Sequence, residues 1–294
     1  MKIAFGLLML FGLLHLYMTL HTTSNPRNGL PIWAERFVTE TETPVNCDGW
    51  LYYHWRTITG STKTPACRHL PEIEVTCKNY LVIREVLFDR LLSWVIPRSP
   101  NVYMCTDKIR PRGKCIVYWF GIGQDWSGPE QMVQDLGCDV YAYDPDPQPL
   151  PVPKGVHYEQ LGIGNETGIF RGETSTAYSG QAGFKIETLK DLLKRNGHDG
   201  NNKVDVLRVD TEGAEYGMFS TIDDQTLSHF GQLAMEIHSG GSHHDRHGSS
   251  DQACDINWFR EKSQNAGAEL KTFYAAHNCH GPAHVIEIGF LINF

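Results

Sequence analysis

Three carboxylates surround one glycine in the segment Asp210-Thr-Glu212-Gly213-Ala-Glu215, directly after the apolar run 204–209. Such a run predicts a buried strand of a parallel sheet, and ligands bind at the carboxyl ends of these strands. Carboxylates there could hold the amino-acid part of a cofactor, position an acceptor hydroxyl or take its proton. Asp210 and Glu212 are therefore candidate catalytic residues, and Asp210 is also a candidate cofactor contact. The alternative is a helix start capped by acidic side chains, which stays open for Glu215.

A second candidate segment is Gly121-Ile-Gly123-Gln-Asp125, which joins the apolar run 115–120 to a stretch of helical length. Glycines at such a turn let the backbone approach a ligand closely, so Gly121, Gly123 and Asp125 are candidate cofactor contacts. The bland alternative is a tight turn between strand and helix.

Asp144 follows the next apolar run, about twenty positions after Gly123, which is the usual distance from such a glycine turn to a ribose-binding carboxylate. We therefore expect Asp144 to accept hydrogen bonds from the ribose of an adenosine-type cofactor. Trp126 stands where the dinucleotide fingerprint has its third glycine, so NAD is a secondary expectation.

His238 ends the apolar run 232–237 and is the third candidate catalytic residue. We expect it to face the acceptor and to accept its proton with a pKa near neutrality. A nearby loop rich in Gly and Ser could bind a divalent metal through His243, His244, Asp245 and His247. We favour the solvated-loop interpretation and assign no metal ligand.

Residues 113–294 contain the strands and helices that would position these residues. Short apolar runs that end in Gly or Asp alternate there with stretches of helical length. This rhythm predicts an α/β domain with a mostly parallel sheet. We expect strands at 115–120, 139–143, 156–161, 204–209 and 232–237, helices at 126–136, 186–195 and 258–266, and an antiparallel end pair at 270–275 and 285–293.

The N-terminal part of the sequence predicts a membrane anchor followed by a stem and a cap. The run 3–20 is almost wholly apolar, so residues 1–24 are expected to be a signal anchor or signal peptide. No Ala-x-Ala site follows, and we favour an uncleaved anchor. Residues 25–46 have the composition of a stem. Residues 47–112 combine aromatic residues, cysteines and the apolar run 80–95, which predicts a helical, disulfide-braced cap.

Composition narrows the partners and the compartment. The net charge of -8, with no run of Lys or Arg, excludes a general affinity for nucleic acid. Eight cysteines can pair completely in an oxidising lumen, and Asn165-Glu166-Thr167 is a glycosylation sequon that fits this location. We expect a single-pass type II membrane protein of the Golgi or ER lumen, or a secreted protein if residues 1–24 are cleaved. The sequence does not fix the oligomeric state.

Three sequence blocks carry a family resemblance. The block "VDVLRVDTEGAEYGMF" resembles the signature of the FkbM-like methyltransferases, and "IVYWFGIGQD" and "DVYAYDPDP" resemble the cofactor strands of the same superfamily. The N-terminal apolar segment and "LAMEIH" are similar to animal secretory-pathway methyltransferase-like proteins. The resemblance covers about residues 113–294.

This resemblance implies a Rossmann-like class I methyltransferase fold with helices on both faces of the sheet, S-adenosylmethionine as donor, and O-methylation. Carried across, Gly121 and Gly123 line the cofactor, Asp144 binds its ribose and Asp210 lies at the methyl-transfer end. The glycine motif departs from the commoner acidic-x-Gly-x-Gly-x-Gly pattern, with Trp119 and Phe120 before the first glycine.

Together these features predict methyl transfer to a hydroxyl of a glycan or small lumenal metabolite, with Asp210 and His238 near the reacting atoms. One alternative is a Golgi glycosyltransferase, because Asp144-Pro-Asp146 has the form of an Asp-x-Asp site for a metal and a sugar nucleotide. The glycine pair and the 210–215 block argue against it. A second alternative is a non-catalytic protein that keeps the methyltransferase fold.

Overall fold

The computed structural model describes residues 71–83, 102–123, 125–147, 151–170, 183–200, 203–223, 225–238, 252–277 and 285–293, which all lie within one unit, Val38–Phe294. The predicted signal segment, the stem and the His-rich loop lie outside these residues. Among the described helices, none has the length and apolar character needed to cross a membrane.

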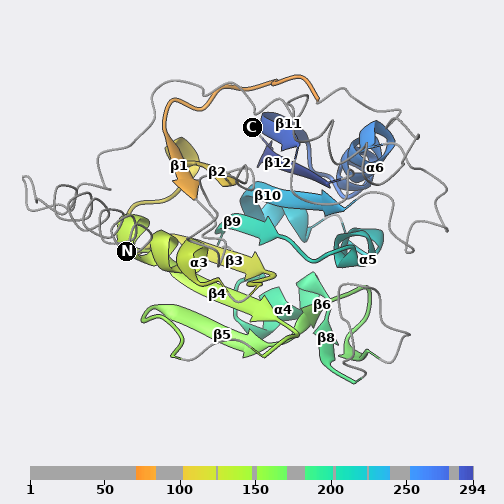
Figure 1. Ribbon diagram of the computed structural model, residues 1–294. Coiled ribbons are helices and arrows are strands. Elements are labelled where there is room, and N and C mark those ends of the chain that lie inside the picture. The colour runs from red at the N-terminus through yellow and green to blue at the C-terminus, as the bar shows by residue number, and fades with distance from the viewer. Residues whose placement is uncertain are drawn as a thin grey trace, which may run out of the picture. The chain divides into compact units, whose positions relative to one another are not determined.

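A seven-stranded sheet with the order β11-β12-β10-β9-β3-β4-β5 forms the centre of the described part (Figure 1). Neighbouring strands from β5 to β10 are parallel, and β12 runs antiparallel to both β10 and β11. This confirms the predicted α/β sheet and its antiparallel end pair. The strands are Ile116–Phe120 (β3), Asp139–Asp144 (β4), Val156–Gln160 (β5), Val204–Val209 (β9), Phe230–His238 (β10), Leu270–His277 (β11) and Val285–Ile292 (β12).

The order of these strands contains a topological switch point. From β3 the chain moves outward through β4 to β5, and it then returns to the other side of β3 as β9 and β10. This is the doubly wound order of Rossmann-like sheets, with β12 inserted antiparallel between β10 and β11. Ligands of such sheets bind at the carboxyl ends of the strands where the order reverses, here between β3 and β9.

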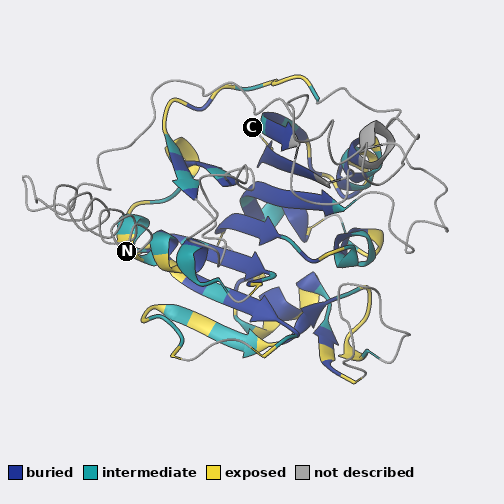
Figure 2. Cartoon of the chain, in the orientation of Figure 1, coloured by how far each residue is buried: buried dark blue, intermediate teal, exposed yellow. Residues whose placement is uncertain are grey.

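Both faces of the sheet are covered, and most of its strands are buried (Figure 2). One face packs against helices α4 (Leu189–Arg195), α5 (Ala214–Ser220) and α6 (Gln252–Asn265). The other packs against strands β1 and β2 and against α3 (Ser127–Gln131) with the π-helical turn η3 (Met132–Leu136). The predicted helix at 126–136 is thus confirmed, and that at 258–266 corresponds to the second half of α6, which begins earlier, at Gln252. The helix expected at 186–195 starts later, because Lys185–Glu187 forms β8, which pairs with the short strands Gly162–Ile163 (β6) and Gly168–Ile169 (β7).

The cap region corrects one prediction. Tyr80–Ile83 is a strand (β1), paired antiparallel with Val102–Cys105 (β2), so the helix expected from Tyr80 is wrong for its first four residues. Alternate residues of β1 are buried against the sheet, and its β-branched side chains suit a strand. A disulfide between Cys77 and Cys105 confirms that the cap is braced. The buried amide side chain of Gln232 in β10 binds both the N–H and the C=O of Cys105, at 2.9 and 3.0 Å.

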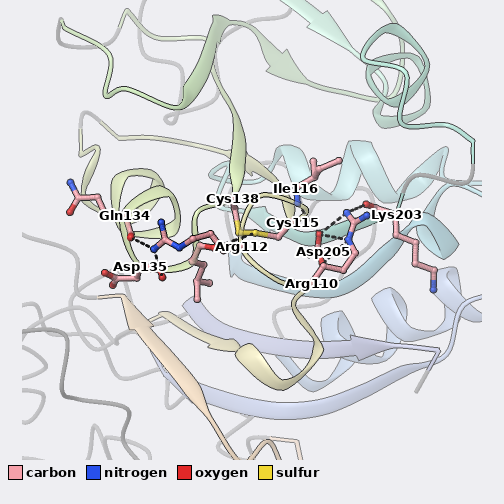
Figure 3. Close-up of a disulfide and its surroundings, with 10 residues drawn as sticks. Arg110, Arg112, Cys115, Ile116, Gln134, Asp135, Cys138, Lys203 and Asp205 are labelled. Carbon is pink, nitrogen blue, oxygen red and sulfur yellow. Dashed lines mark hydrogen bonds and ion pairs between the residues drawn. A yellow bond between two sulfur atoms is a disulfide. The ribbon is translucent and has the colours of Figure 1, made fainter. Parts of the chain in front are cut away.

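A second disulfide, Cys115–Cys138, joins the starts of β3 and β4 at the edge opposite the switch point. Figure 3 shows it between two arginine contacts. Arg110 binds the buried carboxylate of Asp205 at 2.8 Å, and Arg112 donates hydrogen bonds to carbonyl groups at the end of η3. Cys47, Cys67 and Cys279 and the side chain of Cys254 lie outside the described residues.

Replacing both Cys115 and Cys138 by alanine should lower the free energy of unfolding by about 3 kcal/mol, because the disulfide closes a loop of 23 residues in the unfolded chain. Urea unfolding of the wild type and the double variant under oxidising conditions measures this difference. Under strong reduction the two proteins should converge. A difference below about 1 kcal/mol in oxidising buffer would contradict a stabilising role.

Candidate functional site

Gly121 lies where three strands meet at the switch point. Its N–H donates to the carbonyl of Tyr143 at the end of β4, and the N–H of Asp210 donates to the carbonyl of Phe120 at the end of β3, both at 3.0 Å. The φ of Gly121 is +81°, and a Cβ atom there would lie 1.6 Å from the carbonyl oxygen of Asp210. Only glycine fits, and the first predicted cofactor contact is therefore placed directly beside the predicted methyl-transfer residue.

Asp144 is buried and orders the glycine turn. Its carboxylate accepts hydrogen bonds from the N–H groups of Ile122 at 2.7 Å, Gly123 at 3.2 Å and Asp146 at 2.8 Å. Burial raises the pKa of Asp144 above its ordinary value, although these N–H groups oppose the rise. The ribose contact of Asp144 stays a prediction.

Asp125 places a negative charge at the start of helix α3, which disfavours phosphate binding there. Its two carboxylate oxygens accept hydrogen bonds from the N–H and the hydroxyl of Ser127, both at 2.9 Å. In dinucleotide sites the N–H groups of the corresponding helix start bind the diphosphate. A negative charge here would repel that group, and Trp126, packed against Tyr158 with ring centroids 5.4 Å apart, replaces the third glycine. The turn therefore favours an adenosine ligand that carries no diphosphate.

The structure brings the three predicted catalytic residues together. His238 Nε2 lies 3.3 Å from Glu212 Oε2 and 3.8 Å from Asp210 Oδ1. On the other side of the ring, Nδ1 lies 3.3 Å from Glu215 Oε1. Burial alone would lower the pKa of His238, but the hydrogen bond and charge of Glu215, with the charges of Asp210 and Glu236, raise it to about 10. The expectation of a near-neutral pKa is therefore wrong, because His238 is an imidazolium at neutral pH.

Asp210 pairs with Glu236, a residue of β10. Burial, together with the charge of Glu236, raises the pKa of Asp210 to about 8, against the opposing charges of Arg208 and His238. Burial and the charge of Glu287 also raise the pKa of Glu236, and the two carboxyl groups share a hydrogen bond. Two carboxyl groups that share one proton can act as an acid and base pair, which titrates as a unit.

Three charged residues that the sequence analysis did not select support this pair: Arg208, Glu236 and Glu287. The guanidinium of Arg208 is almost fully buried and lies 2.6 Å from Glu287, 3.2 Å from Asp210 and 3.9 Å from Glu236. A signal for them exists in the sequence, because each interrupts a run of apolar residues and a buried charge needs a partner.

The donor set at this edge is a poor fit for a metal ion. Asp210, Glu236 and His238 each bring one potential ligand atom within 4.8 Å of the others. Arg208, however, already supplies a positive charge beside both carboxylates, which weakens their attraction for a cation. We therefore assign no metal to these residues.

Comparisons with known proteins give two curated relatives, while no family model matches the chain. "Probable methyltransferase-like protein 24" of Homo sapiens is 28% identical over 128 residues, which are 42% of this chain and 33% of the relative. The protein of the same name from Rattus norvegicus is 27% identical over 128 residues, with the same shares. The matched region thus spans about a third of these relatives. The predicted resemblance to methyltransferase-like proteins is confirmed.

Two solved structures show low overall similarity. One is M. capricolum TrmK in complex with S-adenosyl-homocysteine, with a TM-score of 0.35, 8% identity, and coverage of 62% of this chain and 64% of that chain. The other is the Methanococcus jannaschii fibrillarin pre-rRNA processing protein, with a TM-score of 0.37, 9% identity, and coverage of 72% and 89%.

Proposed function

We propose that this protein is an S-adenosylmethionine-dependent methyltransferase. The observation that carries the proposal is the glycine turn at the switch point, where Gly121 contacts the backbone of Asp210. Beside it, the carboxylate of Asp125 occupies the helix start and disfavours a phosphate group there. S-adenosylmethionine is an adenosine cofactor without phosphate, which suits this arrangement. The similarity to methyltransferase-like relatives gives independent support.

The residues around the turn would hold this cofactor. Gly121 and Gly123 allow it to lie against the backbone, Asp144 would bind its ribose, and Asp210 would lie at its methyl end. Bound there, the cofactor supplies an electrophilic methyl group on a sulfonium. Gly123 is exposed, and a Cβ there would meet no atom within 4 Å.

The acceptor in this proposal is a hydroxyl group, on a glycan or a small lumenal metabolite. An acceptor hydroxyl at this edge would give its proton to the carboxyl pair of Asp210 and Glu236, whose raised pKa values suit proton acceptance. The imidazolium of His238 would stabilise the negative charge that develops on the acceptor oxygen.

We place this activity in the lumen of the secretory pathway, behind an N-terminal anchor. Three features support this location: the apolar run 3–20, the two disulfides, and the exposed position of Asn165 in its sequon.

Calorimetric titration of the full chain, purified in detergent, tests the cofactor. S-adenosylmethionine and S-adenosylhomocysteine should bind, and Asp144→Asn should weaken both by at least about tenfold, because a charged hydrogen-bonding group is lost. Asp146→Asn is the matched control and should bind normally.

A parallel titration with UDP-sugars and manganese tests the glycosyltransferase alternative. Binding of the sugar nucleotides alone, or unchanged cofactor affinity in Asp144→Asn, would contradict the proposed site. If the adenosyl ligands bind but no acceptor is methylated in a screen of glycans and metabolites, the non-catalytic alternative replaces the proposed reaction.

A further inference from the structure

Glu215 is the most deeply buried carboxylate of the site, with 0% exposure, and it lies in the first turn of α5. It accepts hydrogen bonds from the N–H of Gly213 at 2.7 Å and from the hydroxyl of Thr211 at 3.1 Å. It also accepts one from the backbone N–H of His238 at 3.0 Å and faces the ring Nδ1 at 3.3 Å. One side chain thus ties the loop after β9 to the end of β10.

We propose that Glu215 is a positioning residue that holds His238 as a fixed imidazolium facing Asp210 and Glu236. The proposal rests on the proposed function, in which these two carboxyl groups accept the proton of the acceptor. It deepens that function because it assigns a role to a residue that otherwise only caps a helix.

The contacts of Glu215 fix the direction of the ring. Both the backbone N–H and Nδ1 of His238 point to one carboxylate, so Nε2 must face the opposite side. The charged groups on that side are Asp210 and Glu212 from the loop after β9 and Glu236 from β10, at 3.8, 3.3 and 4.0 Å from Nε2. A proton on each ring nitrogen then satisfies carboxylates on both sides.

Burial makes Glu215 the dominant partner of His238. The side chain of Glu212 is 63% exposed, and water screens its charge, whereas no water screens Glu215. Burial would raise the pKa of Glu215, yet its hydrogen bonds with His238 and the positive charge there hold this pKa below its ordinary value. Glu215 is therefore a permanent counter-charge.

The proton on Nε2 of His238 suits a hydroxyl acceptor. A hydroxyl loses its proton as it is methylated, and its oxygen carries partial negative charge in the transition state, which this N–H would stabilise.

The test is NMR titration of the full chain labelled with 15N-histidine, in which the signal of His238 is assigned by its loss in His238→Asn. In the wild type His238 should titrate near pH 10. Glu215→Gln, which keeps the shape but removes the charge, should lower this midpoint by at least about one pH unit. The exposed control Glu212→Gln should lower it much less.

Two outcomes would overturn the positioning role: a wild-type His238 that titrates near its ordinary pKa, or a midpoint that Glu215→Gln leaves unchanged. If Glu215→Gln does not fold, a wild-type midpoint near the ordinary pKa of histidine would still overturn the role. Since no cofactor is present, the titration is independent of the calorimetric test, and failure of S-adenosylmethionine binding would leave its result intact.

Discussion

Arg208→Met should lower the free energy of unfolding by about 3–5 kcal/mol, because it leaves a buried carboxylate without its counter-charge. Arg208 and Glu287 are 1% and 3% exposed, and their closest atoms are 2.6 Å apart. Neither group can regain water where it lies. The loss should therefore greatly exceed that for a surface ion pair.

Urea unfolding followed by tryptophan fluorescence measures this effect. In the double variant Arg208→Met with Glu287→Leu, both buried charges are gone, and most of the lost stability should return. Arg195→Met is the control, because Arg195 pairs with Glu159 and Glu187 at a partly exposed position, and it should cost less than about 1 kcal/mol. Equal losses in the Arg208 and Arg195 variants would show that the buried pair is not needed for stability.

Gly121→Ala should have the second large effect and should abolish cofactor binding as well as lowering stability by more than about 4 kcal/mol. The added Cβ would overlap the carbonyl oxygen of Asp210 at 1.6 Å, and both groups belong to backbone that cannot rotate away. The glycine turn and the end of β9 would have to move apart, and the cofactor site between β3 and β9 would be lost.

Gly123→Ala is the control for the steric overlap, because it introduces backbone strain alone. Gly123 also has a positive φ, +56°, but a Cβ there meets no atom within 4 Å. Its replacement should cost only about 1–2 kcal/mol, the usual penalty of a left-handed backbone. Thermal unfolding and calorimetric binding of both variants distinguish the two effects. A Gly121→Ala protein as stable as Gly123→Ala would contradict the close contact.

The sheet and its functional edge could be predicted because their signals are local. The apolar run 204–209 followed by Asp210, and the run 115–120 followed by Gly121, each contain a strand and its end within a few residues. Since parallel strands end at a common edge, Asp144 and His238 join them without any knowledge of register.

The charges of the site could not be predicted in this way, because they depend on which residues face each other across strands. Glu236 lies opposite Glu287 in the β10–β12 register, and Arg208 reaches both from β9. This register is set by the whole sheet. The imidazolium state of His238 likewise depends on carboxylates of the 210–215 segment together with Glu236, so an isolated His at a strand end gave the wrong pKa.

Gln232 gives the cap a mechanical link to the sheet. Its side-chain amide reproduces the donor and acceptor of a peptide group, so β2 is held to β10 by a pair of bonds of the kind that normally join neighbouring strands. Because Cys105 is also bonded covalently to Cys77, this pair anchors a closed loop of chain and not a free strand. The strand pair β1–β2 should consequently open only when the sheet opens. The described cap and the sheet then form one cooperative folding unit, although the sequence pattern places a boundary between them.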